Sequence, residues 1–404
     1  MIGTAAETHE RSETAAAICA LFRDELYWEA ADWERQRSVP RDVYERLAAI
    51  DAFRERWADR STRIGRLELA LVLAAEAARV SIGGSIALAS HSEGFLGTLQ
   101  QSPYGREVAD DALSGKLIGA MAISEPTSGS DVTHCETRAE RSSDGWVISG
   151  TKLYVSNIPP ADECLVFARS ADRGTFSDFS LFLVPTTARG FVATPHELVG
   201  SHASGTHVVE LEEVAVPPER LVGRAGTGLA HVLDFLRLER AWAAAACTAI
   251  AELCFEMALA YARERVIAGR PLTDHQAIAH RLADMSTRVE AARLMVRSLL
   301  DGAGRGELSS ARSAQAKLMA ARTAWDVGDE TMQILGGRGY TAATPFHRIW
   351  SDLRVARIGG GTDEVLRDTI ARDLRPGELA AHPDVQAVRA AASTPSYVSP
   401  RDVV

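Results

Sequence analysis

The feature that most constrains the fold is a long stretch of sequence without a helix breaker. Residues 234–265 contain neither Pro nor Gly and are rich in Ala, Leu, Arg and Glu, so they predict one uninterrupted helix. On this helix, Glu239 has apolar neighbours three and four residues away, among them Phe235 and Trp242. A carboxylate on an apolar stripe is either a paired structural charge or a group whose pKa is raised by desolvation, as a general base requires.

Composition narrows the class of protein. With 404 residues, of which 46% are hydrophobic, the chain can form two or three domains with their own cores. A net charge of −10 disfavours nucleic acid or an anionic membrane as the main partner. The N-terminal residues lack the apolar segment of a signal peptide, and the most apolar run, residues 67–80, is too short to span a bilayer. Five cysteines without CxxC spacing suit a reducing compartment, so we expect a cytoplasmic protein.

The order of local patterns predicts the domains. Apolar residues spaced by three and four predict helices up to about residue 118, and again from about residue 228. Between them, short apolar runs separated by turn residues predict the strands of an antiparallel sheet, at 146–148, 164–167, 181–184 and 208–211. We therefore predict an α+β fold with an N-terminal helical domain (1–118), an antiparallel β domain (119–227), a C-terminal four-helix bundle (228–375) and a surface tail (376–404).

Several common catalytic motifs are missing from the sequence. There is no P-loop, no GxGxxG after a strand, no GxSxG and no His cluster with zinc-ligand spacing, so we predict no metal site. What remains are three polar, glycine-rich or hydroxyl-rich segments, residues 122–131, 152–157 and 333–337. Each has an ordinary structural alternative, respectively a solvated turn, a cross-strand aromatic pair and a helix C-cap.

Taken in order, these segments resemble the acyl-CoA dehydrogenase family of flavoenzymes from about residue 20 to residue 375. The first family signature is similar to Ser124-Glu125-Pro126 with Gly129-Ser130-Asp131, and the aromatic strand is similar to Tyr154-Val155-Ser156-Asn157. The second signature is similar to Gln333–Gly337 with Gly339-Tyr340, and the adenosine-contacting turn to Gly361-Thr362-Asp363-Glu364. The family fold has a helical domain, a β domain and a four-helix bundle, in the order predicted above.

The resemblance implies that FAD binds between the β domain and the bundle. The residues it assigns to the cofactor are Met121, Ala122, Ile123, Ser124, Ser130, Tyr154, Val155, Ser156, Arg265, His275, Gln276, Gln333, Leu335, Gly336, Gly337, Thr362 and Glu364. Tyr154 would lie against the flavin ring, and the Ser156 hydroxyl would hydrogen-bond its N5 edge. In some pairings the adenosine contacts would come from a neighbouring subunit, so the resemblance also implies a homodimer or homotetramer.

The resemblance also makes Glu239 a candidate catalytic base. Most family members carry the catalytic Glu at the position of Gly360, whereas isovaleryl-CoA and long-chain acyl-CoA dehydrogenases have Gly there and a base on the first bundle helix, where this chain has Glu239. The implied reaction is α,β-dehydrogenation of an acyl thioester: Glu239 removes the α-proton, the Gly360 N–H binds the thioester carbonyl, and hydride passes to flavin N5. Ser130, Arg240 and Gly361 would contact the substrate.

The implied partners are an acyl group on CoA or on a carrier protein, and an electron acceptor such as an electron-transfer flavoprotein. Divergence near the N-terminus resembles bacterial members that act on carrier-bound groups in secondary metabolism. Arg54, Arg56, Arg60, Arg63 and Arg66 are either a contact for an acidic carrier or a solvated helix face. The alternatives in function are a flavin-dependent monooxygenase or oxidase on the same fold, and a non-catalytic flavin-binding member.

Overall fold

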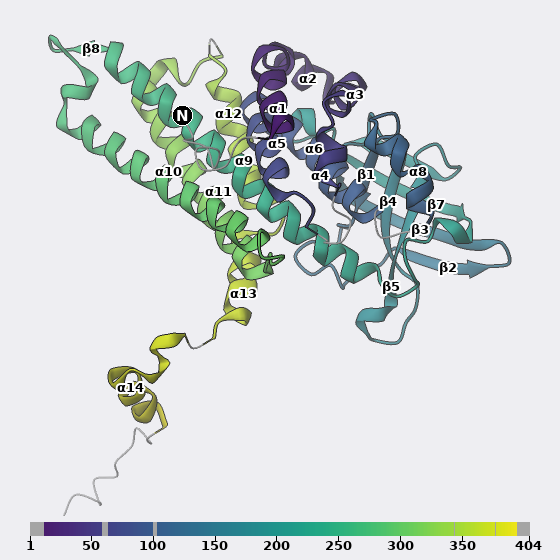
Figure 1. Ribbon diagram of the computed structural model, residues 1–404. Coiled ribbons are helices and arrows are strands. Elements are labelled where there is room, and N and C mark those ends of the chain that lie inside the picture. The colour runs from purple at the N-terminus through teal and green to yellow at the C-terminus, as the bar shows by residue number, and fades with distance from the viewer. Residues whose placement is uncertain (1–11, 59–63, 100–102, 343, 376, 394–404) are drawn as a thin grey trace, which may run out of the picture.

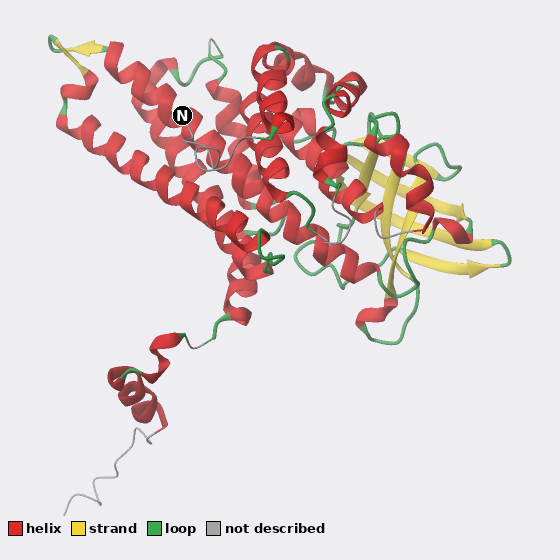
Figure 2. Ribbon diagram, in the orientation of Figure 1, coloured by secondary structure: helices red, strands yellow, loops and turns green. Residues whose placement is uncertain are grey.

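The fold has three parts, shown in Figure 1 for a computed structural model of the chain. The structure describes residues 12–58, 64–99, 103–342, 344–375 and 377–393. Figure 2 shows the strands of the large sheet at one end of the molecule, and the longest helices with a small two-stranded hairpin at the other; the N-terminal helices lie between them in Figure 1. The chain changes from helices to strands at Gly119 and returns to helices at Gly228.

The N-terminal part is helical, as predicted. Its elements are α1 (Glu13–Asp24), α2 (Ala30–Gln36), α3 (Arg41–Ala49), α4 (Ala52–Arg56), α5 (Leu67–Val80), α6 (Ile82–Ala89), a π-helical segment η2 (Ser90–Leu96), α7 (Gly97–Leu99) and α8 (Pro103–Leu113). The apolar positions of α1 that are spaced by three and four residues, Ile18, Leu21 and Phe22, are buried. Helix α5 is apolar on most of its surface because it packs between α1 and the first helix of the bundle.

The middle part is a seven-stranded sheet. Its strands are β1 (Gly119–Ala122), β2 (Arg138–Ser142), β3 (Gly145–Val155), β4 (Glu163–Arg169), β5 (Phe179–Pro185), β6 (Phe191–Pro195) and β7 (His207–Val216). Most pairings are antiparallel, as predicted, but β4 runs parallel to β1 and β2, with Gly119 opposite Glu163 and Arg138 opposite Arg169. The prediction of a wholly antiparallel sheet therefore needs this correction. Parallel neighbours must be joined by a long crossover connection. Here β2 and β3 lie between β1 and β4 in the sequence and form that connection.

Strand β4 is buried on both faces, which explains its continuous apolar run. Leu165 and Phe167 belong to the large core shared with the helices, whereas Cys164 and Val166 belong to a second core inside the β domain. One face of the sheet therefore supports the helical parts of the molecule.

The C-terminal part is the helical bundle. It contains α9 (Gly228–Glu264), α10 (Gln276–Ala303), α11 (Ser310–Leu335), α12 (Phe346–Leu353) and α13 (Asp363–Asp373), with a two-stranded hairpin of β8 (Val266–Ile267) and β9 (Arg270–Pro271) after α9. Ser309 and Thr362 cap α11 and α13 with their side-chain oxygens. The predicted tail includes α14 (Pro383–Ser393), which lies apart from the bundle in Figure 1.

Helix α9 is the central helix of the molecule. An 18-residue window of this helix has a mean hydropathy of 1.6, enough for a membrane span by composition, yet 56% of the window is buried inside the protein. It packs against α5, α10 and α11, so its apolar surface belongs to the core. Gly228 begins the helix where it approaches β5, because a Cβ there would lie 2.5 Å from the Ser180 carbonyl carbon.

A buried acid joins the bundle to the β domain and leads to a stability prediction. Asp352 of α12 is buried and accepts a hydrogen bond from the Ser201 N–H. Burial, aided by the nearby Glu34 carboxylate, raises the pKa of Asp352 to about 7. Because this folded-state pKa lies above the unfolded value of 3.8, ionisation destabilises the fold as pH rises from 3.8 to 7, and the full penalty applies above pH 7.

We therefore expect Asp352→Asn to be more stable than the wild type at pH 8, by at most about 4 kcal/mol. Asn keeps the acceptor for Ser201 and removes the charge. The advantage should grow between pH 4 and pH 7 and then stay constant, as measured by urea unfolding across this range. A variant that is less stable than the wild type at pH 8 would contradict the buried-acid explanation.

Candidate active site

The structure brings Glu239 and Gly360 face to face. Glu239 lies on α9, and Gly360 lies in the turn that precedes α13. A Cβ atom on Gly360 would lie 3.5 Å from both Cδ and Oε2 of Glu239. A side chain at position 360 would therefore begin in contact with this carboxylate, so the two positions open onto the same space. The joint interpretation of Glu239 and Gly360 from the sequence has a geometric basis.

Glu239 carries a carboxylate without a direct partner. Among the described residues it makes no hydrogen bond and no ion pair within 4.0 Å, and the residue is only partly exposed to solvent. Desolvation raises the pKa of Glu239, while the positive charges of Lys317 and Arg240 oppose that rise. Of the two alternatives left open by the sequence, a paired structural charge and a desolvated base, the geometry favours the base.

Two cations bond to the glycine turn, residues 359–361. The Lys317 ammonium of α11 donates to the carbonyl oxygens of Gly359 and Gly361, each at 2.7 Å. The Arg240 guanidinium donates to the Gly360 oxygen at 3.2 Å through Nε. Gly360 and Gly361 have φ values of +66° and +101°, a conformation that favours glycine. The Gly360 N–H has no acceptor among the described residues and can bind a ligand.

The segment predicted to meet the flavin ring lies near the same part of α9. Gly94 of η2 separates Met121 from Phe235, because a Cβ on Gly94 would lie 3.4 Å from the Met121 sulfur and 3.2 Å from a Phe235 ring carbon. Phe235 precedes Glu239 by about one helical turn. Met121 and Ala122 are buried in β1, and Ile123 and Ser124 follow at the partly exposed end of the strand. Residues 121–124 and Glu239 therefore flank a common region.

Tyr154 leaves a large aromatic ring uncovered at the end of β3. Its side chain is 59% exposed, while Val155 is buried beside it, and its ring centroid lies 5.1 Å from that of His196. The Ser156 hydroxyl pairs with Thr206 at 3.2 Å. The end of β3 departs from regular strand geometry. Tyr154 has a φ of +56°, and the register with β7 shifts between Lys152 and Val155.

The loop after β1 is anchored by a buried ion pair. Glu125 accepts from Lys152 Nζ at 2.6 Å, and both side chains are almost completely buried. Glu125 also accepts from the Thr137 N–H at 3.0 Å and from the Cys135 thiol at 3.1 Å. These contacts close the loop at its base and leave Ser130 exposed near its tip.

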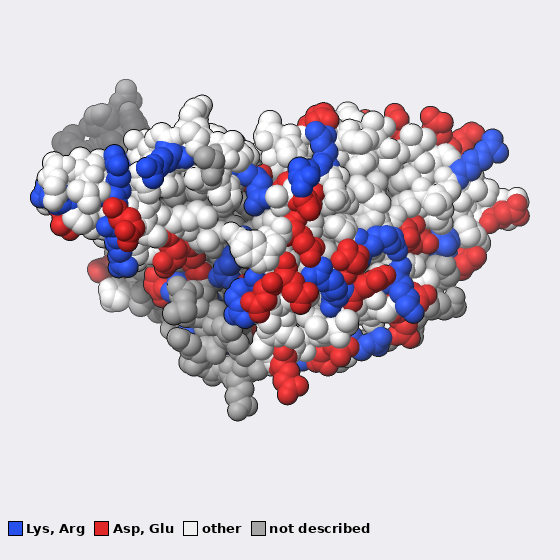
Figure 3. All heavy atoms as spheres, turned by 90° about the horizontal axis from the view of Figure 1, so that it is seen from above, with Lys and Arg blue, Asp and Glu red and all other residues white. Residues whose placement is uncertain are grey.

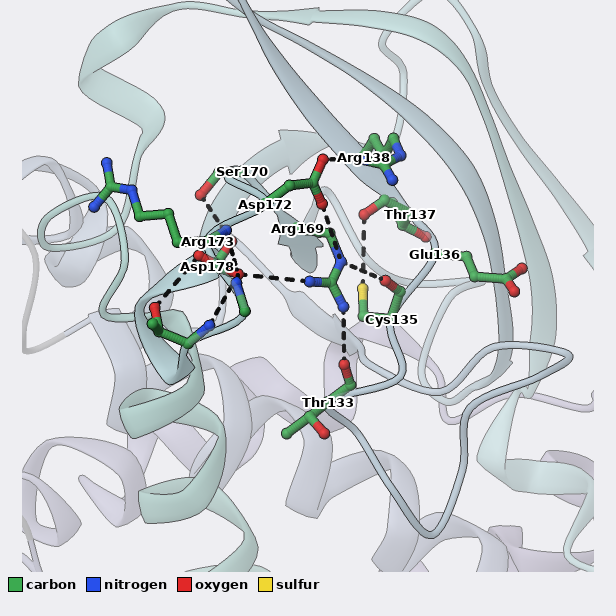
Figure 4. Close-up of polar contacts among 12 residues, drawn as sticks. Thr133, Cys135, Glu136, Thr137, Arg138, Arg169, Ser170, Asp172, Arg173 and Asp178 are labelled. Atoms are coloured by element: carbon green, nitrogen blue, oxygen red, sulfur yellow. Dashed lines mark hydrogen bonds and ion pairs between the residues drawn. The ribbon is translucent and has the colours of Figure 1, made fainter.

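Arg169 fastens the far side of the same loop, as Figure 4 shows. Its guanidinium donates to the carbonyl oxygens of Cys135 at 3.1 Å and Thr133 at 3.0 Å. It also lies 3.7 Å from the Asp178 carboxylate, which accepts from the N–H groups of the neighbouring turn. The loop that carries Ser130 is therefore held at both ends by charged groups of the β domain.

The remaining cofactor candidates lie at the other end of the bundle. Arg265 ends α9, His275 and Gln276 begin α10, and Gln333, Leu335, Gly336 and Gly337 end α11. The Arg281–Glu330 ion pair at 3.0 Å joins the start of α10 to the end of α11, so these residues gather at one end. Arg265 is about 39 Å from Glu239 along α9, at 1.5 Å per residue. Thr362 and Glu364, by contrast, lie next to the glycine turn.

The predicted basic patch is not a continuous surface. Arg56 is buried and paired with Glu93 at 2.6 Å, so its part in the prediction is wrong. Arg54 pairs with Asp110, and Arg66 pairs with two glutamates. Arg60 and Arg63 lie outside the described residues. On the face shown in Figure 3, basic and acidic side chains are interleaved.

Sequence reasoning missed Lys317, Lys152 and Arg169 as organisers of the site. A weak signal for Lys317 was its position as the one charged residue in Ala314–Ala321 of α11, a segment otherwise dominated by Ala. No comparable signal marked the other two, because their partners are far away in the sequence.

Comparison with known proteins identifies sequence relatives of this chain. Residues 120–214 match the family model for the acyl-CoA dehydrogenase middle domain, and residues 226–375 match that for the C-terminal domain. An acyl-[acyl-carrier-protein] dehydrogenase, MbtN, from Mycolicibacterium paratuberculosis is 33% identical over 91% of this chain and 95% of its own length. A mitochondrial isovaleryl-CoA dehydrogenase from Oryza sativa is 34% identical over 65% of this chain and 64% of its own.

A solved structure shows the same fold. The crystal structure of an acyl-CoA dehydrogenase from Geobacillus kaustophilus aligns with a TM-score of 0.83 at 26% identity. The alignment covers 91% of this chain and 100% of that one.

Proposed function

Because this chain belongs to the acyl-CoA dehydrogenase family, we propose that it dehydrogenates the α,β carbon–carbon bond of an acyl thioester with Glu239 as its base. The chain is an FAD-dependent oxidoreductase that acts on acyl thioesters. The observation that carries the proposal for Glu239 is its unpaired, desolvated carboxylate, 3.5 Å from the place of a Cβ on Gly360. Because Gly360 has no side chain, the space next to it stays open, and the Glu239 carboxylate borders this space from α9.

The chain's own groups can perform the proton transfer. An α-proton of a thioester is acidic only while its carbonyl oxygen is stabilised by donors, because the developing charge is enolate-like. The Gly360 N–H is such a donor, and the cations on the neighbouring carbonyls keep it in place. Glu239 then removes the proton from the α-carbon, a role that suits a carboxylate with a raised pKa. The redox chemistry is that of FAD, which takes up hydride from the β-carbon when bound.

The residues near β1 and β3 fit an FAD ring. Tyr154 presents an uncovered aromatic face, and the partly exposed Ser156 hydroxyl lies two residues further along the chain. Residues 121–124 bring the end of a strand to the same region as Phe235 and Glu239. These groups would hold the flavin. Ser130, on the anchored loop, and Arg240 would meet the substrate.

The separation along α9 supports a site completed by a second copy of the chain. Arg265 lies about 39 Å from Glu239 along α9, at 1.5 Å per residue, which is more than the diameter of a small domain. A cofactor bound beside Glu239 is therefore far from Arg265 of the same chain. Nucleotide contacts from the end of a partner's bundle would resolve this, so we propose a homodimer or homotetramer.

The acyl carrier, electron acceptor and cellular location are further parts of the proposal. A relative that matches most of this chain is named for an acyl-carrier-protein substrate, which favours a carrier-bound acyl group and a place in secondary metabolism. We propose an electron-transfer flavoprotein as acceptor and the cytoplasm as location, the latter from cysteine usage.

The deciding experiment is anaerobic titration of the purified holoenzyme with saturated acyl groups, each presented on CoA and on a phosphopantetheinyl carrier protein. Loss of flavin absorbance together with an α,β-unsaturated product is expected for one acyl class. Rapid reoxidation by oxygen would identify an oxidase, and an oxygenated product would identify a monooxygenase. A colourless protein would indicate a non-catalytic member.

The raised pKa of Glu239 predicts the pH dependence of flavin reduction. Below that pKa the carboxyl is protonated and cannot act as a base, so the rate constant should rise with pH through a midpoint above the ordinary value of 4.5. Anaerobic stopped-flow measurement between pH 4.5 and pH 9 tests this. A rate that is already constant at pH 4.5 would contradict the assignment.

A further inference from the structure

Lys317 is a buried cation that the reaction as derived above does not use. Its side chain lies within the bundle on α11 and is fully shielded from solvent. Burying an ammonium is costly unless it is hydrogen-bonded and faces negative charge. Lys317 has three N–H donors, and two of them bond to the carbonyl oxygens of Gly359 and Gly361, at 2.7 Å each. Among the described residues it makes no ion pair within 4.0 Å.

These two hydrogen bonds determine how the glycine turn is oriented. In a trans peptide, the C=O and N–H groups point in opposite directions. Because the Gly359 oxygen points at Lys317, the N–H of Gly360 points away from it. Arg240 holds the next oxygen, that of Gly360, and Lys317 holds the one after. Three consecutive peptide groups are thus oriented by side chains from α9 and α11. Three glycines in a row have little conformational preference of their own.

Lys317 also acts on Glu239 electrostatically. Its positive charge opposes the rise in the pKa of Glu239, as does that of Arg240. The other charged or titratable groups that face this region are Arg240 and Cys247 on α9 and Asp363 on α13. Asp363 is paired with Arg357 at 2.8 Å, and Lys317 and Arg240 are the cations whose charges act on Glu239.

We propose that Lys317 is a positioning residue for the dehydrogenation: it directs the Gly360 N–H toward the thioester carbonyl and places a positive charge in the region of the Glu239 carboxylate. The inference rests on the proposed function and deepens it. It assigns one side chain to both groups that act on the substrate, the donor to the carbonyl and the base at the α-carbon. A purely structural anchor would instead support folding alone.

The test compares Lys317→Met with Thr331→Val, a control on the same helix. Thr331 is also buried and reaches across to α9, with Oγ1 donating to the Cys254 oxygen at 3.0 Å, but it does not contact the glycine turn. In Lys317→Met, the rate of flavin reduction should fall about 100-fold, as expected for a misplaced oxyanion donor. The rising limb of the pH profile should also move to higher pH, because a cation near the base is lost. Thr331→Val should keep the wild-type limb and a rate within about 3-fold of wild type, a margin small beside a lost donor.

Hydrogen exchange supplies a readout that needs no turnover. The backbone amides of residues 355–366 should exchange faster in Lys317→Met than in the wild type. In Thr331→Val their exchange rate should equal that of the wild type. If Lys317→Met does not fold, Lys317→Arg takes its place. The rate of flavin reduction should fall in this variant, but the rising part of its pH profile should stay at the wild-type position because the positive charge remains.

The proposal is overturned if Lys317→Met reduces its flavin at the wild-type rate with an unmoved pH limb, or if Lys317→Arg moves that limb. Failure of the proposed function looks different. A wild-type holoenzyme that no acyl thioester bleaches would refute the dehydrogenase assignment, and the exchange data would still report whether Lys317 orders the glycine turn.

Discussion

Replacing Glu239 by Gln is expected to lower the rate of flavin reduction by an acyl thioester about 10²- to 10⁴-fold, the range typical for loss of a general base. Gln has the same shape and cannot accept the α-proton. Because the wild-type carboxylate has no hydrogen-bond partner among the described residues, the amide breaks no contact of the fold. The measurement is anaerobic stopped-flow absorbance of the bound flavin, with one acyl thioester at saturating concentration.

Two controls separate chemistry from folding in this variant. The protein should remain yellow, and its unfolding midpoint should match or exceed that of the wild type, since a desolvated carboxylate has been replaced by a neutral group. Glu256→Gln is a matched exposed substitution, because Glu256 lies on the same helix, α9, and is not one of the candidate site residues. It should retain a reduction rate far closer to that of the wild type. If Glu239→Gln bleaches as fast as the wild type, another group is the base.

Removing the ammonium of Lys152 is expected to destabilise the β domain by about 3–5 kcal/mol, the cost of leaving a buried charge without its partner. In Lys152→Met, Glu125 keeps its hydrogen bonds from the loop but loses the cation at 2.6 Å. The loop from Glu125 to Cys135 would lose the ion pair at its base. Urea unfolding followed by circular dichroism at pH 7 measures the effect. The double variant Glu125→Gln with Lys152→Met should recover much of the loss, because no unpaired charge remains.

The pH dependence of this effect has a defined sign. Lys152 and nearby N–H groups overcome desolvation and lower the pKa of Glu125 from 4.5 to about 2. A depressed carboxyl pKa contributes stability above the unfolded value near 4.5, and this contribution is lost as pH falls toward 2. The stability gap between wild type and Lys152→Met should therefore narrow below pH 4.5. Equal stability of the two proteins at pH 7 would refute the role of the pair.

Long regular elements could be predicted from local sequence. The uninterrupted helix predicted over residues 234–265 is confirmed in α9, and the helices predicted between about residues 228 and 375 are confirmed in α10, α11, α12 and α13. The apolar runs assigned to strands are confirmed in β3, β4, β5 and β7. The parallel pairing of β1 with β4 was missed because strand pairing depends on segments that are distant in sequence.

The site could be predicted only where two positions carried complementary information. Glu239 stood out on its apolar stripe, but only the family resemblance linked it to Gly360, and the structure brings the two positions together. Arg56 was misjudged because the sequence around it reads as a solvated basic face, while its partner Glu93 belongs to the π-helical segment η2. Lys317 was overlooked for the same reason: its role depends on a turn about forty residues further along the chain.

Helix α9 carries the base near one end and begins the proposed nucleotide contacts at the other. Inserting or deleting one residue between these ends would rotate everything downstream by about 100° and shift it by about 1.5 Å. Substitutions in the middle of the helix change only local packing. The number of residues between Glu239 and Arg265 is therefore a stricter requirement of the fold than the identity of any single residue within that interval.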